Sequence, residues 1–385
     1  MGQIYQNAYV TIAATHARNG TEGLHAEPRP RLMARSLLSR DLYVGHKTWL
    51  PQIGGGEYSN EKFPLLSRGW VLQERLLSPR MVHFLDNMVV WECPSGVKAE
   101  DRLTFLPRET KSLPFSNDEC SSEDLIALWH TIVTHCSQSL FTFEDDRLPA
   151  IAALAQRMLL LRPGDEYLAG LWKSTLLDDL TWEPGAKSKR TKSTIWKAPT
   201  WSWVSGSYVE FTNLGALIPT ISLVDVFYRQ NGPVHLGQIL DASITIEAQI
   251  VTFHCKAALP PETCFYGVKF SHPGSDVNLE TTFNLNEIAL DDPDLVSSDA
   301  PDGVTELRPD EGLGDDLTLH FLPLRYTLHY FIGLILRKVS SRTYERIGFM
   351  IVSHSNFDRN FFEYGIWNSV KHILSPWPMT TVKII

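Results

Sequence analysis

The chain has 385 residues, 43% of them hydrophobic and 21% charged, which is typical of folded globular proteins. This composition excludes a disordered, collagen-like or coiled-coil chain, and the length predicts two or three packed units. The net charge of -9 equals that of residues 291–316 alone, where ten carboxylates stand against the single base Arg308. Because no basic stripe is present elsewhere, nucleic acid is not an expected partner.

Cysteine usage and hydrophobic runs predict the compartment. The five cysteines form no CxxC pair and are odd in number, so neither a disulfide framework nor a zinc site is expected. No hydrophobic run approaches the roughly 18 residues of a membrane span. The N-terminus lacks the basic region of a signal peptide, and Gln6 stands where a myristoylation motif needs Ser or Thr. These features predict a reducing, cytoplasmic environment.

The first zone, residues 1–111, combines short strands with one helix. Residues 8–15 are apolar and β-branched, which predicts a buried strand, and residues 67–77 have helical spacing that ends before Pro79. Two strand-like runs follow, MVHFL and MVVWEC, joined by Asp86 and Asn87. Two turn-forming residues between two such runs predict a β-hairpin.

The hairpin fixes a register. With Asp86 and Asn87 as the turn, His83 faces Val90, and the other expected pairs are Leu85 with Met88, Phe84 with Val89, Val82 with Trp91 and Met81 with Glu92. His83 and Glu92 then share one face of the hairpin as diagonal neighbours.

The second zone, residues 112–198, is expected to be helical. Ser121 or Ser122 precedes Glu123 and Asp124, and the apolar residues from Leu125 to Cys136 recur at helical spacing. Residues 148–161 and 167–180 repeat this pattern. The basic stretch at residues 185–194 is expected to be a solvated loop.

The third zone, residues 199–385, reads as strands. Six β-branched or aromatic segments are separated mostly by turn residues: ISLVDVFY, SITIEAQIVTFHC, FYGVKF, HYFIGLILRK, RIGFMIVS and TTVKII. They predict a sandwich or barrel, with residues 291–316 as an acidic surface loop that lacks the spacing of an EF-hand. The expected fold class is therefore α+β.

Most standard catalytic signatures are missing. The chain has no GxSxG elbow, P-loop, GxGxxG or HExxH motif, and the glycines at 54–56 lack the Lys-Ser/Thr of a phosphate loop. His130 and His135 are five residues apart, a spacing that separates them around a helix. No metal and no cofactor are expected.

The chain contains eleven tryptophans, including Trp201 and Trp203 in the run TWSW. In a strand these two indoles would project from one face. Two interpretations stay open: packing in the hydrophobic core, or the wall of an apolar small-molecule pocket with indole N–H donors.

Charged residues gather on the predicted helix and hairpin. They are Arg68, Glu74, Arg75, Arg80, His83 and Glu92. One interpretation is a single buried polar cluster, formed by all of these except Arg80, that fixes the hairpin to the helix; the other is a catalytic or ligand-binding site.

A family resemblance rests on segments that follow one another in this order: IYQNAYVTIAAT, SRGWVLQERLLSPRMVHFLDNMVVWEC, RLPAIAALAQ, YLAGLWKSTLLDDLTW, KAPTWSWVSG and TTVKII. Together they resemble fungal heterokaryon-incompatibility (HET) domain proteins, with residues 1–111 as the C-terminal part of a HET-like domain. The family's N-terminal portion, which looks distantly like a TIR-type α/β domain, would precede Met1. The positions that match the family pattern are Arg68, Gly69, Trp70, Gln73, Glu74, Arg75, Arg80, His83 and Glu92.

The resemblance implies two functions of different classes. One is signalling or interaction with protein partners in heterokaryon incompatibility and cell death. The other is an enzyme of fungal terpenoid secondary metabolism, similar to the norbornene-forming pericyclases of sordaricin-type diterpenoid biosynthesis. Such an enzyme would catalyse an intramolecular [4+2] (Diels-Alder) cyclisation of a hydrophobic substrate without a cofactor. The second is favoured, with Arg68, Arg75, His83 and Glu92 as expected catalytic residues and Trp70, Trp172, Trp201 and Trp203 as expected substrate-binding residues.

Overall fold

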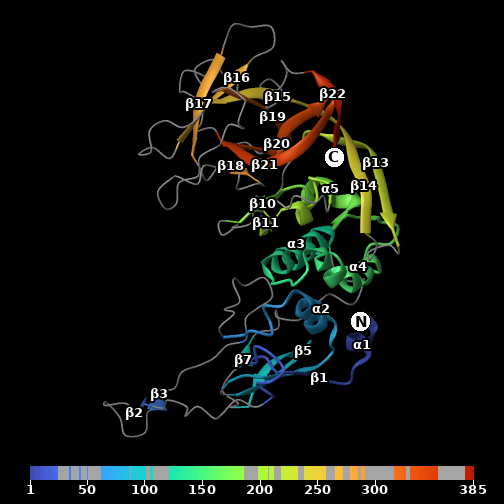
Figure 1. The fold of residues 1–385 in the computed structure, drawn as a ribbon, viewed down its shortest axis with the longest axis vertical. Helices are drawn as coiled ribbons and strands as arrows, with labels where there is room; N and C mark the ends of the chain where they lie inside the picture. The colour runs from blue at the N-terminus through green and yellow to red at the C-terminus, as the bar shows by residue number, and fades with distance from the viewer. Residues whose placement is uncertain are drawn as a thin grey trace. The chain divides into compact units, whose positions relative to one another are not determined.

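The chain is an α+β protein whose C-terminal half is dominated by one large sheet (Figure 1). The computed structural model describes residues 1–24, 34–35, 43–44, 50, 62–86, 88–100, 105–106, 121–185, 198–206, 208–211, 218–232, 238–256, 265–271, 278–284, 288–290, 316–326, 330–353 and 378–385. The chain divides into two compact units, Met1–Asp165 and Glu166–Ile385. Among the described residues, no helix has the length and hydrophobicity needed to cross a membrane.

The N-terminal unit combines a small sheet with helices. The sheet has the order β1-β4-β5-β6-β7, with β1 parallel to β4 and the remaining pairs antiparallel. The elements are α1 (Gly2–Asn7), β1 (Thr11–Ala13), β2 (Ala34–Arg35), β3 (Tyr43–Val44), α2 (Gly69–Leu77), β4 (Met81–Phe84), β5 (Val89–Cys93), β6 (Gly96–Ala99), β7 (Phe105–Leu106), α3 (Ser122–Gln138), η2 (Glu144–Asp146), η3 (Pro149–Ile151) and α4 (Ala152–Leu159).

The predicted helix and hairpin are both present. Helix α2 ends at Leu77, and the capping residue Ser78 donates its hydroxyl to the Glu74 carbonyl at 2.7 Å before Pro79 follows. The β4–β5 pairing has the predicted register, Met81 with Glu92 through Phe84 with Val89. The Leu85 N–H donates to the Met88 carbonyl at 2.9 Å. The register prediction is therefore confirmed.

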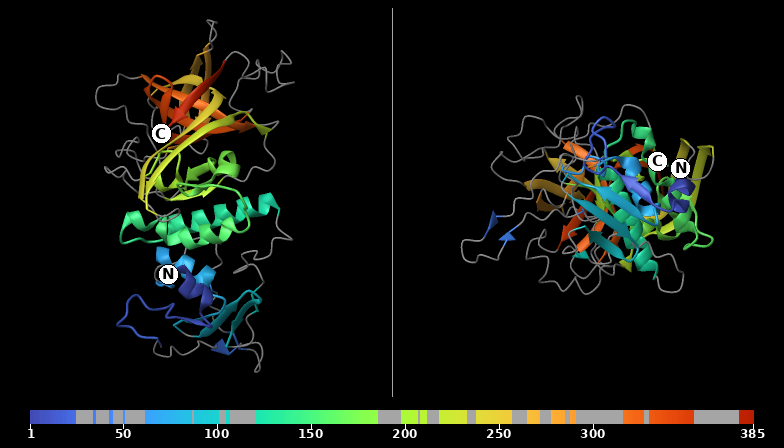
Figure 2. Two further views of the ribbon diagram at one scale, coloured as in Figure 1. Left: turned by 90° about the vertical axis from the view of Figure 1, so that its right-hand side faces the viewer. Right: turned by 90° about the horizontal axis from the view of Figure 1, so that it is seen from below.

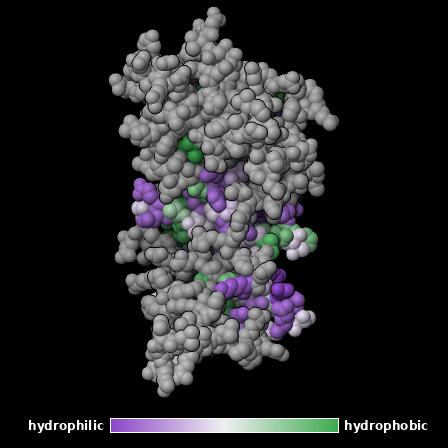
Figure 3. Space-filling model, turned by 90° about the vertical axis from the view of Figure 1, so that its left-hand side faces the viewer, coloured by the Kyte–Doolittle hydropathy of each residue, from purple (hydrophilic) through white to green (hydrophobic). Residues whose placement is uncertain are grey.

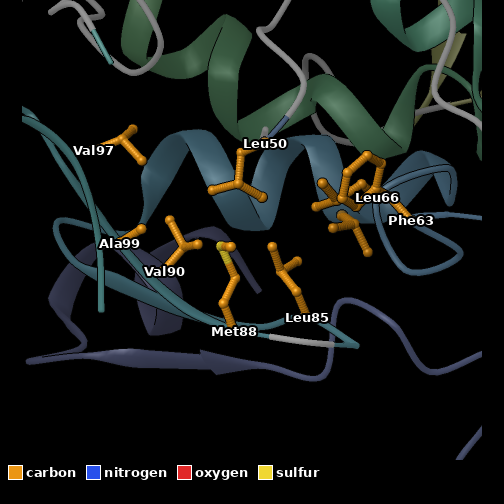
Figure 4. Packing of buried hydrophobic residues seen from close by; sticks show 9 residues of the cluster. Leu50, Phe63, Leu66, Leu85, Met88, Val90, Val97 and Ala99 are labelled. Carbon is orange, nitrogen blue, oxygen red and sulfur yellow. The ribbon is translucent and has the colours of Figure 1, made fainter. Parts of the chain in front are cut away.

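A hydrophobic cluster lies between α2 and the sheet. Figure 4 shows Leu85, Met88 and Val90 pointing from the hairpin toward the helix. The buried residues of the cluster are Leu50, Phe63, Leu66, Val71, Leu85, Met88, Val90, Val97 and Ala99. Because a buried Val or Leu side chain contributes about 1.5–3 kcal/mol, this cluster is a main source of stability in the unit.

Helix α3 begins where the sequence predicts. The Ser121 hydroxyl accepts a hydrogen bond from the Asp124 N–H at 3.1 Å, and the Asp124 carboxylate accepts one from the Ser121 N–H at 2.9 Å. This reciprocal capping box satisfies two N–H groups that the helix cannot pair itself. Leu125, Trp129 and Ile132 are buried on one face, as their spacing indicates.

The predicted buried strand at residues 8–15 is only partly correct. Strand β1 covers Thr11–Ala13, and Ala13 is buried, but Tyr9 and Ile12 are exposed. Strand β1 pairs with β4 alone among the described strands, so only the side chains on its inner face are covered. Apolar composition indicated a strand here but could not show that it lies at the edge of the sheet.

The C-terminal unit is mainly β. Its elements are β8 (Tyr167–Leu168), β9 (Leu171–Trp172), η4 (Lys173–Thr175), α5 (Leu176–Asp179), β10 (Trp182–Pro184), η5 (Trp203–Ser205), β11 (Val209–Phe211), β12 (Ile218–Pro219), β13 (Ser222–Asn231), β14 (Gln238–Gln249), β15 (Val251–Lys256), β16 (Phe265–Ser271), β17 (Asn278–Asn284), β18 (Ile288–Leu290), β19 (Asp316–Tyr326), β20 (Tyr330–Ser340), β21 (Thr343–Ser353) and β22 (Met379–Ile384).

The predicted strands join one large sheet rather than two stacked sheets. Its order is β13-β14-β22-β21-β20-β19-β15-β16-β17, with β12 on β19 and β18 on β21 (Figures 1 and 2). Strands β14 and β15 are separated by Ile250 alone, yet β14 pairs with β22 and β15 with β19. The hydrogen-bonded neighbours that run from β14 through β22, β21, β20 and β19 therefore lead to β15, the strand that follows β14 directly in the chain. Side chains on both faces of the sheet are fully buried: Leu322 and Ile332 lie on one face, and Met350, which pairs with Gly333, lies on the other.

Two expectations for the helical zone differ from the structure. Residues 167–180 were expected to be one helix, but β8, β9 and a two-residue turn occupy their first half. Positive φ angles at Ala169 (50°) and Gly170 (93°) form that turn, which periodicity does not reveal. In addition, the units divide at Asp165, so α3 and α4 belong to the N-terminal unit and α5 to the C-terminal unit.

Two predicted surface segments lie outside the described residues: the acidic stretch at 291–316, apart from Asp316 at the start of β19, and most of the basic stretch at 185–194. On the face shown in Figure 3, the described residues expose small hydrophobic areas among hydrophilic ones.

Candidate functional site

A buried ionic network joins α2 to the hairpin. Arg75 of α2 donates to both carboxylate oxygens of Glu92 on β5, with Nη2–Oε1 at 2.8 Å and Nε–Oε2 at 3.0 Å. The Nε2 atom of His83 on β4 lies 3.1 Å from Glu92 Oε2. All three side chains are buried. The structure thus brings together three of the four residues expected to be catalytic.

Thr15 extends this network to the segment after β1. Its hydroxyl oxygen lies 2.9 Å from Nδ1 of His83. Because the Glu92 carboxylate accepts hydrogen bonds, Nε2 of His83 carries a proton, and in the neutral imidazole Nδ1 accepts from the Thr15 hydroxyl. Local patterns in the sequence do not reveal Thr15, because the parallel pairing of Ala13 with His83 is a long-range contact. We call Thr15, Arg75, His83 and Glu92 the buried network.

The charges of the buried network are set by burial and by Arg75. Burial alone would raise the pKa of the Glu92 carboxyl, but the Arg75 charge and hydrogen bonds from His83 and Arg75 outweigh it and hold the pKa well below its usual value. Burial, reinforced by the charge of Arg75, lowers the pKa of His135 on α3 to about 3. Glu92 is therefore ionised and His135 neutral at pH 7.

The expected single cluster is in fact two groups. Arg68 is exposed at the start of α2, and Glu74 is half-buried beside Tyr5. Burial raises the pKa of Glu74, although a hydrogen bond from Tyr5 and the charge of Arg68 partly offset this effect. Consecutive helical residues point about 100° apart, so Glu74 and Arg75 reach different surroundings. Arg68 and Glu74 therefore lie outside the buried network.

The chemistry open to the buried network is limited by access. Thr15, His83 and Glu92 follow the order of a hydroxyl, an imidazole and a carboxylate that activates nucleophiles in hydrolases. However, Thr15, His83 and Glu92 are each 0% exposed, and Arg75 neutralises the carboxylate. A substrate atom cannot reach the Thr15 hydroxyl in this conformation. The arrangement supports a structural role that fixes α2, β4 and β5 together.

Tryptophans form a second cluster, in the C-terminal unit. Trp201 and Trp203 do not lie in a strand, because the segment makes a turn followed by the short helix η5. The two indoles therefore do not project from one face of a strand. The side chains that are fully buried are Trp172, Trp182, Trp201 and Trp203, which we call the tryptophan cluster.

Hydrogen bonds fix most of this cluster. The Trp203 indole donates to the Gly170 carbonyl at 3.2 Å, and the Ser202 hydroxyl donates to the Ala169 carbonyl at 2.6 Å. The TWSW segment is therefore bonded to the positive-φ turn between β8 and β9. The Trp182 indole donates to the Trp201 carbonyl at 3.0 Å.

Trp201 differs from Trp182 and Trp203, whose indoles both donate hydrogen bonds. Its indole N–H is buried and has no hydrogen-bond acceptor in the part of the chain that the structure describes. An unsatisfied buried N–H costs about 1–3 kcal/mol, and few native groups are left in this state. Such a group is a donor available to a ligand.

A buried cation lies against the cluster. The Arg346 guanidinium of β21 sits 3.3 Å from the centre of the Trp182 ring, and its Nη1 donates to the Leu180 carbonyl at 2.9 Å. Its Nη2 donates to the Trp182 carbonyl. In the sequence, Arg346 is only the first residue of the predicted strand RIGFMIVS. An arginine in an otherwise apolar strand was the available signal.

Trp70, the remaining expected substrate-binding residue, belongs to the N-terminal unit. It is half-buried on α2, and its indole donates to the Asp146 carboxylate at 3.2 Å. The structure brings three of the four predicted tryptophans into one unit and leaves Trp70 in the other.

Comparisons with known proteins add no relative. No family model matches the chain, and searches of curated proteins and of solved structures return no match. Within the described residues, no group of three or more His, Cys, Asp or Glu side chains is arranged to hold a metal ion.

Proposed function

We propose that the protein is a cofactor-independent pericyclase of fungal terpenoid metabolism that forms a norbornene by an intramolecular [4+2] cyclisation. The observation that carries the proposal is the N–H of Trp201, which is buried in the tryptophan cluster and has no acceptor among the described residues. A buried donor of this kind in apolar surroundings suits a hydrophobic substrate with one carbonyl acceptor.

The reaction makes modest chemical demands. A cyclopentadiene and a tethered alkene form two carbon–carbon σ bonds at the expense of two π bonds, and no atom, proton or electron is gained or lost. Confinement in a near-attack geometry lowers the entropic part of the barrier. A hydrogen bond from Trp201 to a carbonyl conjugated with the alkene would stabilise the charge that develops on that oxygen. A total of about 4 kcal/mol would accelerate the reaction roughly a thousandfold.

The tryptophan cluster is buried, so the substrate can enter only if other side chains move. Trp172, Trp201 and Trp203 are each 0% exposed, so the substrate must displace the side chains that cover them. The large apolar area of a polycyclic terpenoid favours such an exchange, since about 25 cal/mol is gained per Å² removed from water. In this proposal the tryptophan cluster binds substrate, and the buried network stabilises the N-terminal unit.

The wider setting belongs to the same proposal. We infer that residues 1–111 are a HET-type segment, that the protein acts in the cytoplasm, and that its partner is a hydrophobic small molecule. The HET resemblance supports the first inference, the cysteine usage supports the second, and the tryptophan-rich composition supports the third.

The test is to incubate purified protein with a polycyclic cyclopentadiene that bears a tethered alkene conjugated to a carbonyl. Product should form faster than in buffer, and chelation or dialysis should leave the rate unchanged. Equal rates with and without protein would contradict the proposal. Consumption of NAD by the same preparation would instead favour the HET signalling function.

A further inference from the structure

Strand β13 presents an exposed edge in the C-terminal unit. Among the described strands it pairs with β14 alone, and it lies at the margin of the sheet in Figures 1 and 2. Val224 is 57% and Phe227 47% exposed on this strand. An edge strand offers a row of backbone N–H and C=O groups that can pair with another strand.

The middle of β13 is regular. Its pairing with β14 shifts between Leu223 and Asp225 and again between Arg229 and Gln230. The five residues from Asp225 to Arg229 lie between these irregularities in continuous register. Asp225, Phe227 and Arg229 alternate along the strand, so they share one face, and all three are exposed.

The opposite face of β13 points inward. The Tyr228 hydroxyl accepts a hydrogen bond from the backbone N–H of Ala169, in the turn to which the TWSW segment is bonded. This contact fixes which face of β13 meets solvent. The Tyr228 contact thus fixes β13 to the rest of the C-terminal unit, while Asp225, Phe227 and Arg229 on the other face are exposed to solvent.

We propose that β13 pairs antiparallel with β13 of a second copy, with the two-fold axis at Phe227. In this arrangement Phe227 faces the partner's Phe227, Asp225 faces the partner's Arg229, and Arg229 faces the partner's Asp225. Opposite charges and aromatic pairs at facing positions both stabilise antiparallel strands. The stretch is therefore complementary to itself, as a two-fold interface requires.

The charges on β13 favour pairing with a second copy and are not those of an edge strand that avoids association. Edge strands that avoid association usually carry lysines, so that like charges meet when two copies approach. On β13 the same approach brings Asp225 to the partner's Arg229 on both sides of the axis. The internal contact of Arg229 does not compete strongly, because its Nη2 lies 4.0 Å from Asp241 Oδ2 and both side chains are exposed.

The contact is short, so a concentration-dependent dimer is expected. A five-residue strand pair buries less than the roughly 1,200 Å² of a standard stable interface. We expect a dissociation constant of ~10 μM for this dimer.

The experiment is sedimentation velocity of the full chain at increasing concentration. The wild-type protein should dimerise, and Asp225→Arg and Arg229→Asp, each of which makes like charges face at two positions, should weaken dimerisation by about tenfold or more. An equimolar mixture of these two variants should form a mixed dimer, because both arginines of one copy then face both aspartates of the other. Lys383→Asp, an equal charge change at an exposed site on β22, serves as the control and should dimerise as the wild type does.

The mixture of the two variants distinguishes a lost interface from misfolding, because two misfolded variants would not dimerise with each other. A monomer at every concentration up to about 200 μM, well above the expected constant, would overturn the proposal. Dimerisation of both single variants at wild-type strength, or a mixture that stays monomeric, would also overturn it.

Discussion

Arg75 of α2 and Glu92 of β5 form a two-pronged ion pair in the interior of the N-terminal unit, with their closest atoms 2.8 Å apart. Arg75 is 1% and Glu92 0% exposed. Removal of one member of such a pair leaves an uncompensated charge away from water, at a cost of about 3–5 kcal/mol. The pair therefore links α2 to the hairpin more strongly than a surface ion pair could.

Glu92→Ala should lower the free energy of unfolding by about 3–5 kcal/mol, because it leaves Arg75 buried without its carboxylate. The measurement is urea unfolding at pH 7. Glu74→Ala is the matched control, and it should cost about 1 kcal/mol or less because Glu74 is half-buried and outside the buried network. Equal losses in the two variants would contradict the division into two groups.

Stability should fall as the pH is lowered from about 6.5, because of His135. Its pKa is about 3 in the folded protein and near 6.5 when unfolded, so between these values the unfolded state binds the extra proton. The slope contributed by this residue should approach about 1.4 kcal/mol per pH unit. Glu92, whose folded pKa is lowered, adds a further loss only as the pH falls below about 4.3.

Urea midpoints at pH 7, 6 and 5 measure this dependence. His135→Gln, which cannot take up the proton, should flatten the curve between pH 6.5 and 5 whatever its stability at pH 7. An unchanged slope in this variant would show that another group causes the acid sensitivity.

Arg346→Lys should destabilise the C-terminal unit by about 2–3 kcal/mol. Lysine keeps the charge but cannot lie flat on the Trp182 ring while donating to the Leu180 and Trp182 carbonyls. Thermal unfolding followed by near-UV circular dichroism would detect both the loss of stability and the altered tryptophan environment. Arg342→Lys, at an exposed turn, should change neither.

Gly333→Ala should prevent or severely weaken folding. A Cβ atom at this position on β20 would come within 2.2 Å of the Leu322 carbonyl oxygen on β19, and backbone atoms cannot move aside cheaply. We expect a loss of about 3 kcal/mol or more, at the upper end for overpacked cores. Gly20→Ala, where no atom of the described residues beyond its two chain neighbours lies within 4 Å of the added Cβ, should leave the melting temperature nearly unchanged.

Local patterns in the sequence predict much of this fold. The hairpin register followed from Asp86 and Asn87, the start of α3 from Ser121 and Asp124, and most strands after Ser222 from their β-branched runs. These features depend on residues close together in the chain, where turn and capping chemistry acts directly.

The features that the sequence did not predict also share a cause. Thr15 reaches His83 only because two distant strands pair in parallel, and Arg346 reaches Trp182 across more than 160 positions. The TWSW segment is not a strand because its groups bind a turn formed by Ala169 and Gly170, which a period of two cannot indicate. Tertiary contacts of this kind override local propensity.

The most direct test of the central proposal compares the cyclisation rates of Trp201→Phe and Trp129→Phe on one substrate. Both changes shrink a fully buried indole, but Trp129 lies on α3, in the other unit. If the Trp201 N–H stabilises the transition state, Trp201→Phe should lower kcat by about 10²-fold, the effect of losing one well-placed donor. Trp129→Phe should stay near the wild-type rate at temperatures where both variants are folded. Equal rates for the two variants, or no acceleration by the wild-type protein, would contradict the account.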